Sequence, residues 1–76
     1  MIATLRMAKS PQIEGWHFLV AVTEDGEIFA CSTPIEPGNF REALACEYQM
    51  QKFLESAGMS VDTMYLPWHT EGESNG

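Results

Sequence analysis

The chain has 76 residues, and its four basic and eleven acidic side chains give a formal net charge of −7 at pH 7. Hydrophobic residues make up 45% of the sequence, a share that supports a folded core and argues against intrinsic disorder. A field this negative repels nucleic acid and anionic membrane surfaces, so the charge argues against direct binding to either and favours partners with basic surfaces.

Nothing in the sequence indicates export or membrane insertion. The N-terminal stretch MIATLRMAKS lacks the continuous apolar core of a signal peptide, and no apolar run approaches the ~20 residues that span a bilayer. The two cysteines, Cys31 and Cys46, are too few for a disulfide framework. We therefore expect a cytoplasmic protein with packed, free thiols, and a disulfide between the two is the alternative.

Three strands are expected in the first half of the chain. Residues 1–9 alternate between two faces, and this period of two predicts a strand that ends at Pro11, because proline cannot donate to a sheet ladder. Residues 16–23 and 28–33 predict two further strands joined by an acidic Asp-Gly turn, a strong hairpin signal since glycine accepts a positive φ. The larger apolar residues of the second strand are expected to face the core: Trp16, Phe18, Val20 and Val22.

Two registers fit this hairpin. A two-residue Asp-Gly loop pairs Val22 with Phe29 and Val20 with Cys31, but it also sets two glutamates opposite each other. A three-residue loop with a bulge relieves that repulsion and pairs Val22 with Ile28. We favour the first register, because core packing outweighs one exposed like-charge pair worth roughly a few tenths of a kcal/mol.

Residues 39–57 predict one amphipathic helix. Asn39 is the expected N-cap, and Glu42 stands three residues later, where its carboxylate reaches back to the backbone N–H of the cap. Gly58 supplies the left-handed residue that ends the helix. Apolar residues at helical spacing predict one buried stripe: Ala43, Cys46, Met50, Phe53, Leu54 and Ala57.

The element order predicts an α+β fold. An alternating run from Val61 to Leu66 indicates a fourth strand, so the order is three strands, a helix and a strand. The simplest architecture is an antiparallel sheet of about four strands with the amphipathic helix packed on one face. We expect a single domain over residues 1–68 and a flexible polar tail over residues 69–76.

No group of side chains predicts an enzyme, a cofactor or a metal site. A cysteine nucleophile would require Cys46 to meet His17 or His69, and the predicted elements keep these residues apart. The sequence has no Cys-x-x-Cys motif, no regularly spaced metal ligands and no glycine-rich phosphate loop. The basic residues are scattered, so no nucleic-acid groove is predicted.

Acidic side chains are the candidate partner-binding groups. Spaced carboxylates imitate the phosphates that a basic groove binds, and an aromatic ring among them suits the core of an interface. The candidates are Glu24, Asp25 and Glu27 at the hairpin turn, with Glu47, Tyr48 and Glu55 on the helix. The alternative is an acidic surface that serves solubility alone.

The helix carries a second stripe beside the buried one, with Phe40, Leu44 and Tyr48 among its members. One helix over a small sheet has little use for two apolar stripes, so a structural or oligomerising module, a homodimer through this stripe, is the second function hypothesis. A further possibility is that Phe40 and Leu44 pack under the proline-containing loop and the last strand. The chain is thus either a monomer or a homodimer.

The hairpin FLVAVTEDGEIFACS and the helix NFREALACEYQMQKFLESAG, within a short acidic chain, resemble the small anti-CRISPR proteins that phages use against bacterial effector complexes. The resemblance covers residues 16–66 and is one of size, charge and element order. It implies a stoichiometric, non-enzymatic inhibitor in the host cytoplasm that occupies a basic, nucleic-acid-binding surface, such as that of a CRISPR effector complex. These inhibitors share no motif, so the resemblance assigns no role to individual residues.

Overall fold

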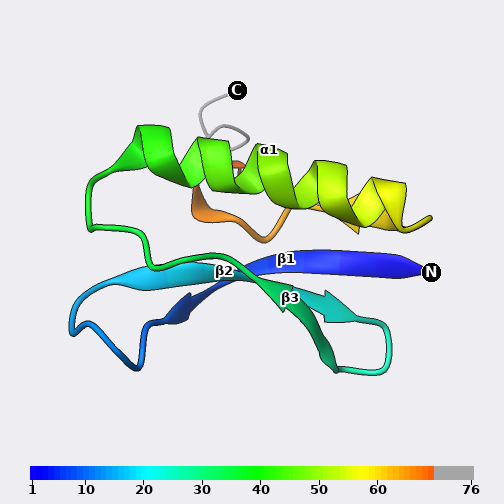
Figure 1. The fold of residues 1–76 in the computed structure, drawn as a ribbon, viewed down its shortest axis with the longest axis horizontal. Helices are drawn as coiled ribbons and strands as arrows, with labels where there is room; N and C mark the ends of the chain where they lie inside the picture. Colours follow the sequence, from blue (N-terminus) through cyan, green and yellow to red (C-terminus); the bar gives the residue numbers. More distant parts are fainter. Residues whose placement is uncertain (70–76) are drawn as a thin grey trace.

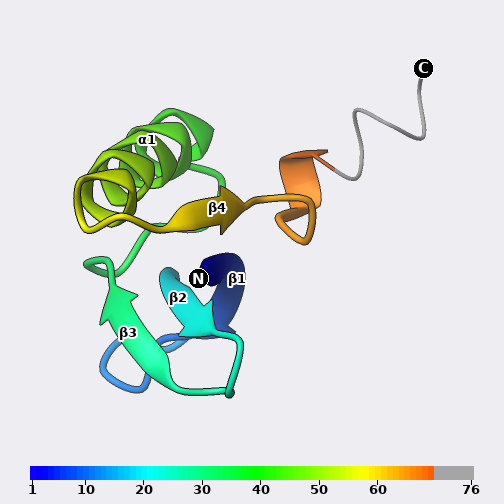
Figure 2. The same ribbon diagram turned by 90° about the vertical axis from the view of Figure 1, so that its right-hand side faces the viewer.

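The structure is a computed structural model that describes residues 1–69, and residues 70–76 lie outside the described part. Its elements are, in chain order, β1 (Ile2–Lys9), β2 (His17–Thr23), β3 (Ile28–Cys31), α1 (Phe40–Ser56) and β4 (Ser60–Asp62). The strands form one sheet in the order β3-β2-β1-β4, and α1 covers one of its faces (Figures 1 and 2). The predicted α+β architecture of four strands and one helix is confirmed.

The sheet is mixed. β1, β2 and β3 pair antiparallel as predicted, whereas β4 runs parallel to β1, with Ile2 opposite Ser60, so the prediction of an antiparallel sheet is wrong for this strand. The 17-residue helix carries the chain back along the sheet before β4 begins, so β4 starts at the same end as β1. β4 is shorter than the predicted strand. Leu66 N–H donates to the Thr63 carbonyl in the turn that follows, and the Leu66 side chain is fully buried.

The hairpin of β2 and β3 contains the bulge that we did not favour. Val22 pairs with Ile28, as the three-residue loop requires, while Val20 pairs with Cys31 as in the other register. Phe29 is therefore the extra residue at a bulge. The favoured register is wrong at the turn because a three-residue loop with a bulge fits the twist of the strands and also separates the like charges.

The helix covers the face of β2 opposite to the predicted one. Leu19 and Ala21 are fully buried in the core with Leu5 of β1. The set predicted to face the helix is wrong: Trp16, Phe18 and Val22 are half-buried, and Val20 is buried outside the main core cluster. A strand that is apolar on both faces does not specify which one the helix covers, and a shift of one residue exchanges them.

Asn39 caps the start of α1 and Gly58 ends it, as predicted, but the predicted bond from the backbone N–H of Asn39 to the Glu42 carboxylate does not form. Asn39 Oδ1 accepts a hydrogen bond from the Glu42 backbone N–H at 3.2 Å, while the Glu42 carboxylate binds the Asn39 side-chain amide instead of the backbone N–H of the cap. At the other end Gly58 has φ +84°. Met59 N–H donates to the Leu54 carbonyl, which is the Schellman arrangement.

The buried stripe of α1 is rotated relative to the predicted one. The residues buried on the helix are Ala43, Glu47, Met50 and Leu54. Phe53 and Ala57 were predicted inside but are exposed, and Cys46 is half-buried. The reason lies in the sheet order, because α1 packs over β4 and β2 and leaves its Phe53 side toward the edge strand β3.

Candidate partner-binding surface

Hydrogen bonds hold the turn between β2 and β3 in one conformation. Gly26 N–H donates to the Thr23 carbonyl at 2.9 Å, and Thr23 N–H donates to the Glu27 carbonyl at 2.8 Å. The Thr23 hydroxyl donates to the Asp25 carboxylate, and the same oxygen accepts from the Glu27 N–H. Gly26 lies at φ +85°, a conformation that L side chains rarely adopt. The backbone that carries the acidic side chains is therefore well defined.

Glu24, Asp25 and Glu27 are all exposed on this turn. One Glu24 oxygen accepts from the Ile2 N–H at 3.0 Å, which links the turn to the start of β1. Within residues 1–69, no lysine or arginine forms an ion pair with any of the three. The turn therefore presents negative charge without a basic side chain to offset it, at the end of the molecule that also holds the N-terminus and the end of α1 (Figure 1).

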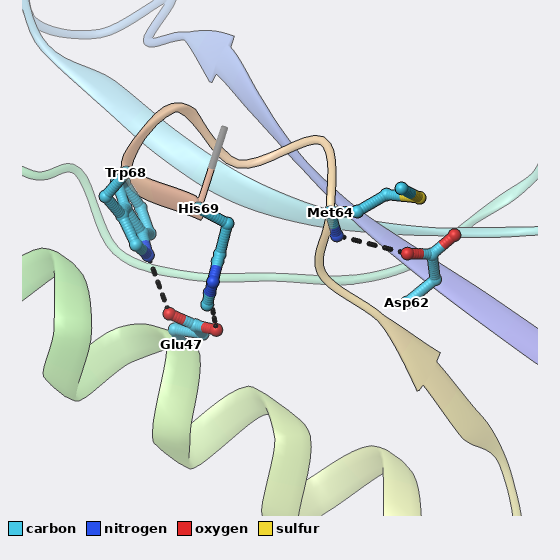
Figure 3. Close-up of polar contacts among 5 residues, drawn as sticks. All are labelled: Glu47, Asp62, Met64, Trp68 and His69. Atoms are coloured by element: carbon cyan, nitrogen blue, oxygen red, sulfur yellow. Dashed lines mark hydrogen bonds and ion pairs between the residues drawn. The ribbon is translucent and has the colours of Figure 1, made fainter. Parts of the chain in front are cut away.

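Glu47 is not at the surface. It is only 7% exposed, and both of its oxygens have partners within the chain (Figure 3). The Trp68 indole Nε1–H donates to Oε1 at 2.8 Å, and His69 Nε2 lies 2.6 Å from Oε2. The prediction of Glu47 as a partner-binding residue is wrong, because a buried carboxylate with two internal partners stabilises the fold.

The Glu47 contacts fix the last described residues to the helix. Residues 67–69 form a helical turn, and the Phe40 ring packs edge-on against Trp68 with centroids 5.8 Å apart. His69 was predicted to begin a flexible tail, and its contact with Glu47 corrects this. The rest of that predicted tail lies outside the described residues. The available signal was the position of Glu47, four residues after Ala43, in the buried stripe of the helix.

Tyr48 and Glu55 share the exposed face of α1, since seven residues make almost two full turns. Tyr48 is 61% exposed, and Lys52 Nζ lies 5.4 Å from the centre of its ring. Glu55 is exposed and, like the acidic turn, lies toward the end of the molecule where α1 finishes. The ammonium of Lys52 between them makes this face less acidic than the turn.

Both cysteines are among the residues that line a groove between β3 and α1. Both are free thiols; Cys31 is exposed and Cys46 is half-buried. Burial raises the pKa of the Cys46 thiol, and the Glu42 carboxylate raises it further, against the opposing effect of a hydrogen bond with Ser32. Less thiolate at neutral pH makes Cys46 a weak nucleophile. Within residues 1–69 no three His, Cys, Asp or Glu side chains are placed to hold a metal ion.

The described part of the chain has no helix that is both long and apolar enough to cross a membrane. Comparison of the chain with known protein families, with curated proteins and with solved structures gives no match.

Proposed function

We propose that the protein is a non-enzymatic binding protein whose acidic hairpin turn meets a basic surface of another protein. The observation that supports this is the cluster of Glu24, Asp25 and Glu27, exposed on a turn that hydrogen bonds hold and without a basic ion-pair partner in residues 1–69. Carboxylates in such an arrangement speed the approach of a basic surface and restrict its orientation.

The partner class follows from the same charge. Surfaces that bind nucleic acid are basic, because they neutralise phosphates. We therefore propose that the protein inhibits such a partner by occupying its nucleic-acid-binding surface, and a CRISPR effector complex is the example that the resemblance in size and charge suggests. Tyr48 and Glu55 form the proposed second contact region, which excludes the buried Glu47.

The test is capture of the partner from a lysate of the cell in which the protein acts, at low and high salt. Exposed charge pairs are screened over about 10 Å at 0.1 M ionic strength, so capture should weaken steeply as salt rises. The captured protein should bind nucleic acid, and the two ligands should compete for it. A partner that binds equally well at high salt, or that binds nucleic acid simultaneously, would contradict the proposal.

A matched pair of variants separates the turn from the general charge of the chain. Asp25→Asn with Glu27→Gln removes two charges from the turn, and Glu14→Gln with Glu36→Gln removes two charges from exposed sites elsewhere. We expect the turn variant to slow association about tenfold, since steering charges act mainly on the association rate. The other variant should change it less than about twofold. Equal effects would indicate that only net charge matters.

A homodimer through α1 is the second candidate function. Phe40, Leu44 and Tyr48 are 53%, 42% and 61% exposed, which leaves an apolar stripe on the helix uncovered by residues 1–69 apart from the contact of Phe40 with Trp68. Light scattering at high protein concentration tests this candidate. A dimer that Leu44→Glu dissociates would support it, and a monomer at all concentrations would rule it out.

A further inference from the structure

β3 is the outermost strand on one side of the sheet. On its inner side, Ser32 N–H donates to the Leu19 carbonyl and Thr23 N–H donates to the Glu27 carbonyl. N–H and C=O groups alternate in direction along an antiparallel ladder. Counted from Glu27 on one side of the bulge at Phe29 and from Ser32 on the other, the groups of Ile28 and Cys31 therefore point away from the sheet. No strand within residues 1–69 pairs with this edge. β3 is short and bulged, so an added strand would pair with the outward groups of Ile28 and Cys31 on either side of Phe29.

An apolar groove lies between this edge and the helix. Ala30 and Cys31 line it from β3, and Cys46, Met50 and Phe53 line it from α1. Its volume of about 340 Å³ is at the small end of the roughly 300–1,000 Å³ of small-molecule pockets, which suits one or two inserted side chains. A peptide strand paired with β3 would direct alternate side chains into this groove.

The negative charge next to the β3 edge indicates which kind of segment would pair with it. Glu27 immediately precedes β3, so a strand added to the edge passes the acidic turn at one of its ends. A second copy of the chain carries the same formal charge of −7 and is repelled, whereas a basic segment is attracted. The complementary occupant is an extended segment with alternating apolar side chains and basic residues at one end.

We propose that the edge of β3 binds such a segment of a partner protein as a fifth strand, with an apolar side chain in the groove and basic residues beside Glu24, Asp25 and Glu27. Strand addition of this kind uses main-chain hydrogen bonds for affinity and a groove for specificity. In the antiparallel orientation, the basic residues stand at the C-terminal end of the segment. The inference rests on the proposed function, because it specifies how the basic partner is held.

The probe is a displayed library of random twelve-residue peptides, selected against the whole protein at low salt. Enriched peptides should alternate apolar residues and carry lysine or arginine toward their C-terminal end. Cys31→Pro removes an outward N–H without breaking the inner ladder, because proline is tolerated where the N–H faces outward on an edge strand. It should weaken binding of the enriched peptides on the order of tenfold, whereas the control Cys31→Ser, which keeps the N–H, should change it less than about twofold.

A second measurement does not depend on the folding of the proline variant. In amide NMR spectra of the unaltered protein, adding an enriched peptide should shift the amide resonances of Ile28, of Cys31 and of the α1 residues that line the groove. Shifts confined to other surfaces, or a library that yields no binders, would overturn the inference. If Cys31→Pro has no effect on binding but the Asp25→Asn and Glu27→Gln variant abolishes it, the edge proposal fails while the proposed function stands. If Cys31→Pro weakens peptide binding and the Asp25→Asn and Glu27→Gln variant does not, the proposed role of the acidic turn is wrong.

Discussion

Replacing Glu47 with alanine should destabilise the fold by about 3 kcal/mol. A hydrogen bond to a charged group contributes about 1.5–3 kcal/mol, and the 2.8 Å bond from Trp68 is of this kind. The His69 side chain is 40% exposed, so water can replace part of that contact and we assign it less than about 1 kcal/mol. Domains of this size have a free energy of unfolding of about 4–11 kcal/mol, so the loss is a large fraction of the total.

Urea and thermal unfolding followed by circular dichroism measure this effect. At about 4–8 °C per kcal/mol, the melting temperature should fall by about 12–24 °C. Glu55→Ala is the matched control, because it removes an exposed glutamate from the same helix and should cost less than about 0.5 kcal/mol. Trp68→Phe removes the indole donor, so in a double-mutant cycle it should couple to Glu47→Ala by about 1–2 kcal/mol.

The reasoning would be refuted by two results. If Glu47→Ala and Glu55→Ala had the same stability, Glu47 would not be holding the Trp68 and His69 turn against α1. If the cycle showed no coupling, the Trp68 contact would contribute nothing, and any loss in Glu47→Ala would have to come from elsewhere in the helix.

Three further predictions follow from the turn, the cap and the thiols. Gly26→Ala should lower the free energy of unfolding, measured in urea, by about 1 kcal/mol or more, because Gly26 has φ +85°. A Cβ at this position would lie within 4 Å of no other atom, so the cost comes from the backbone conformation alone. Asn39→Ala should cost about 1 kcal/mol in the same assay through loss of the cap to Glu42; an unchanged midpoint would contradict the cap. Iodoacetamide followed by mass spectrometry should modify Cys31 well before Cys46, because Cys31 is exposed and Cys46 is half-buried. Burial raises the pKa of the Cys46 thiol, so the rate at Cys46 should go on rising with pH beyond the point where an unperturbed thiol levels off; equal rates for the two cysteines at pH 8 would contradict this.

Elements with local signals could be predicted from the sequence. Asn39, Glu42 and Gly58 mark the ends of α1 through interactions within a few residues, so the helix boundaries are correct. The Asp-Gly turn likewise locates the hairpin, and the alternation of residues 1–9 locates β1. These features depend on backbone preferences that neighbouring residues determine, which is why they can be recognised without knowledge of the rest of the fold.

Features that depend on distant partners could not be predicted in the same way. Which face of β2 is covered depends on where a helix twenty residues later packs, and both faces are apolar enough to serve. β4 joins β1 in parallel because α1 returns the chain along the sheet, which no residue in β4 specifies. The charge of Glu47 predicts a surface residue, and its two partners, Trp68 and His69, stand in a segment without a local helix or strand signal.

The arrangement of α1 separates the proposed dimer stripe from the β3 edge, although Tyr48 belongs both to that stripe and to the second contact region. Ala43, Met50 and Leu54 form the buried stripe, and at 3.6 residues per turn the remaining positions divide into two flanks on either side of it. Cys46 and Phe53 are on the flank that lines the groove beside β3, whereas the members of the proposed dimer stripe are on the other: Phe40, Leu44 and Tyr48. A homodimer through the second flank would leave the β3 edge and the acidic turn open, so Leu44→Glu should not affect peptide binding and Cys31→Pro should not affect the oligomeric state. Any cross-effect would mean that one surface serves both interactions, and the β3 edge would then have to be reassigned as part of the dimer.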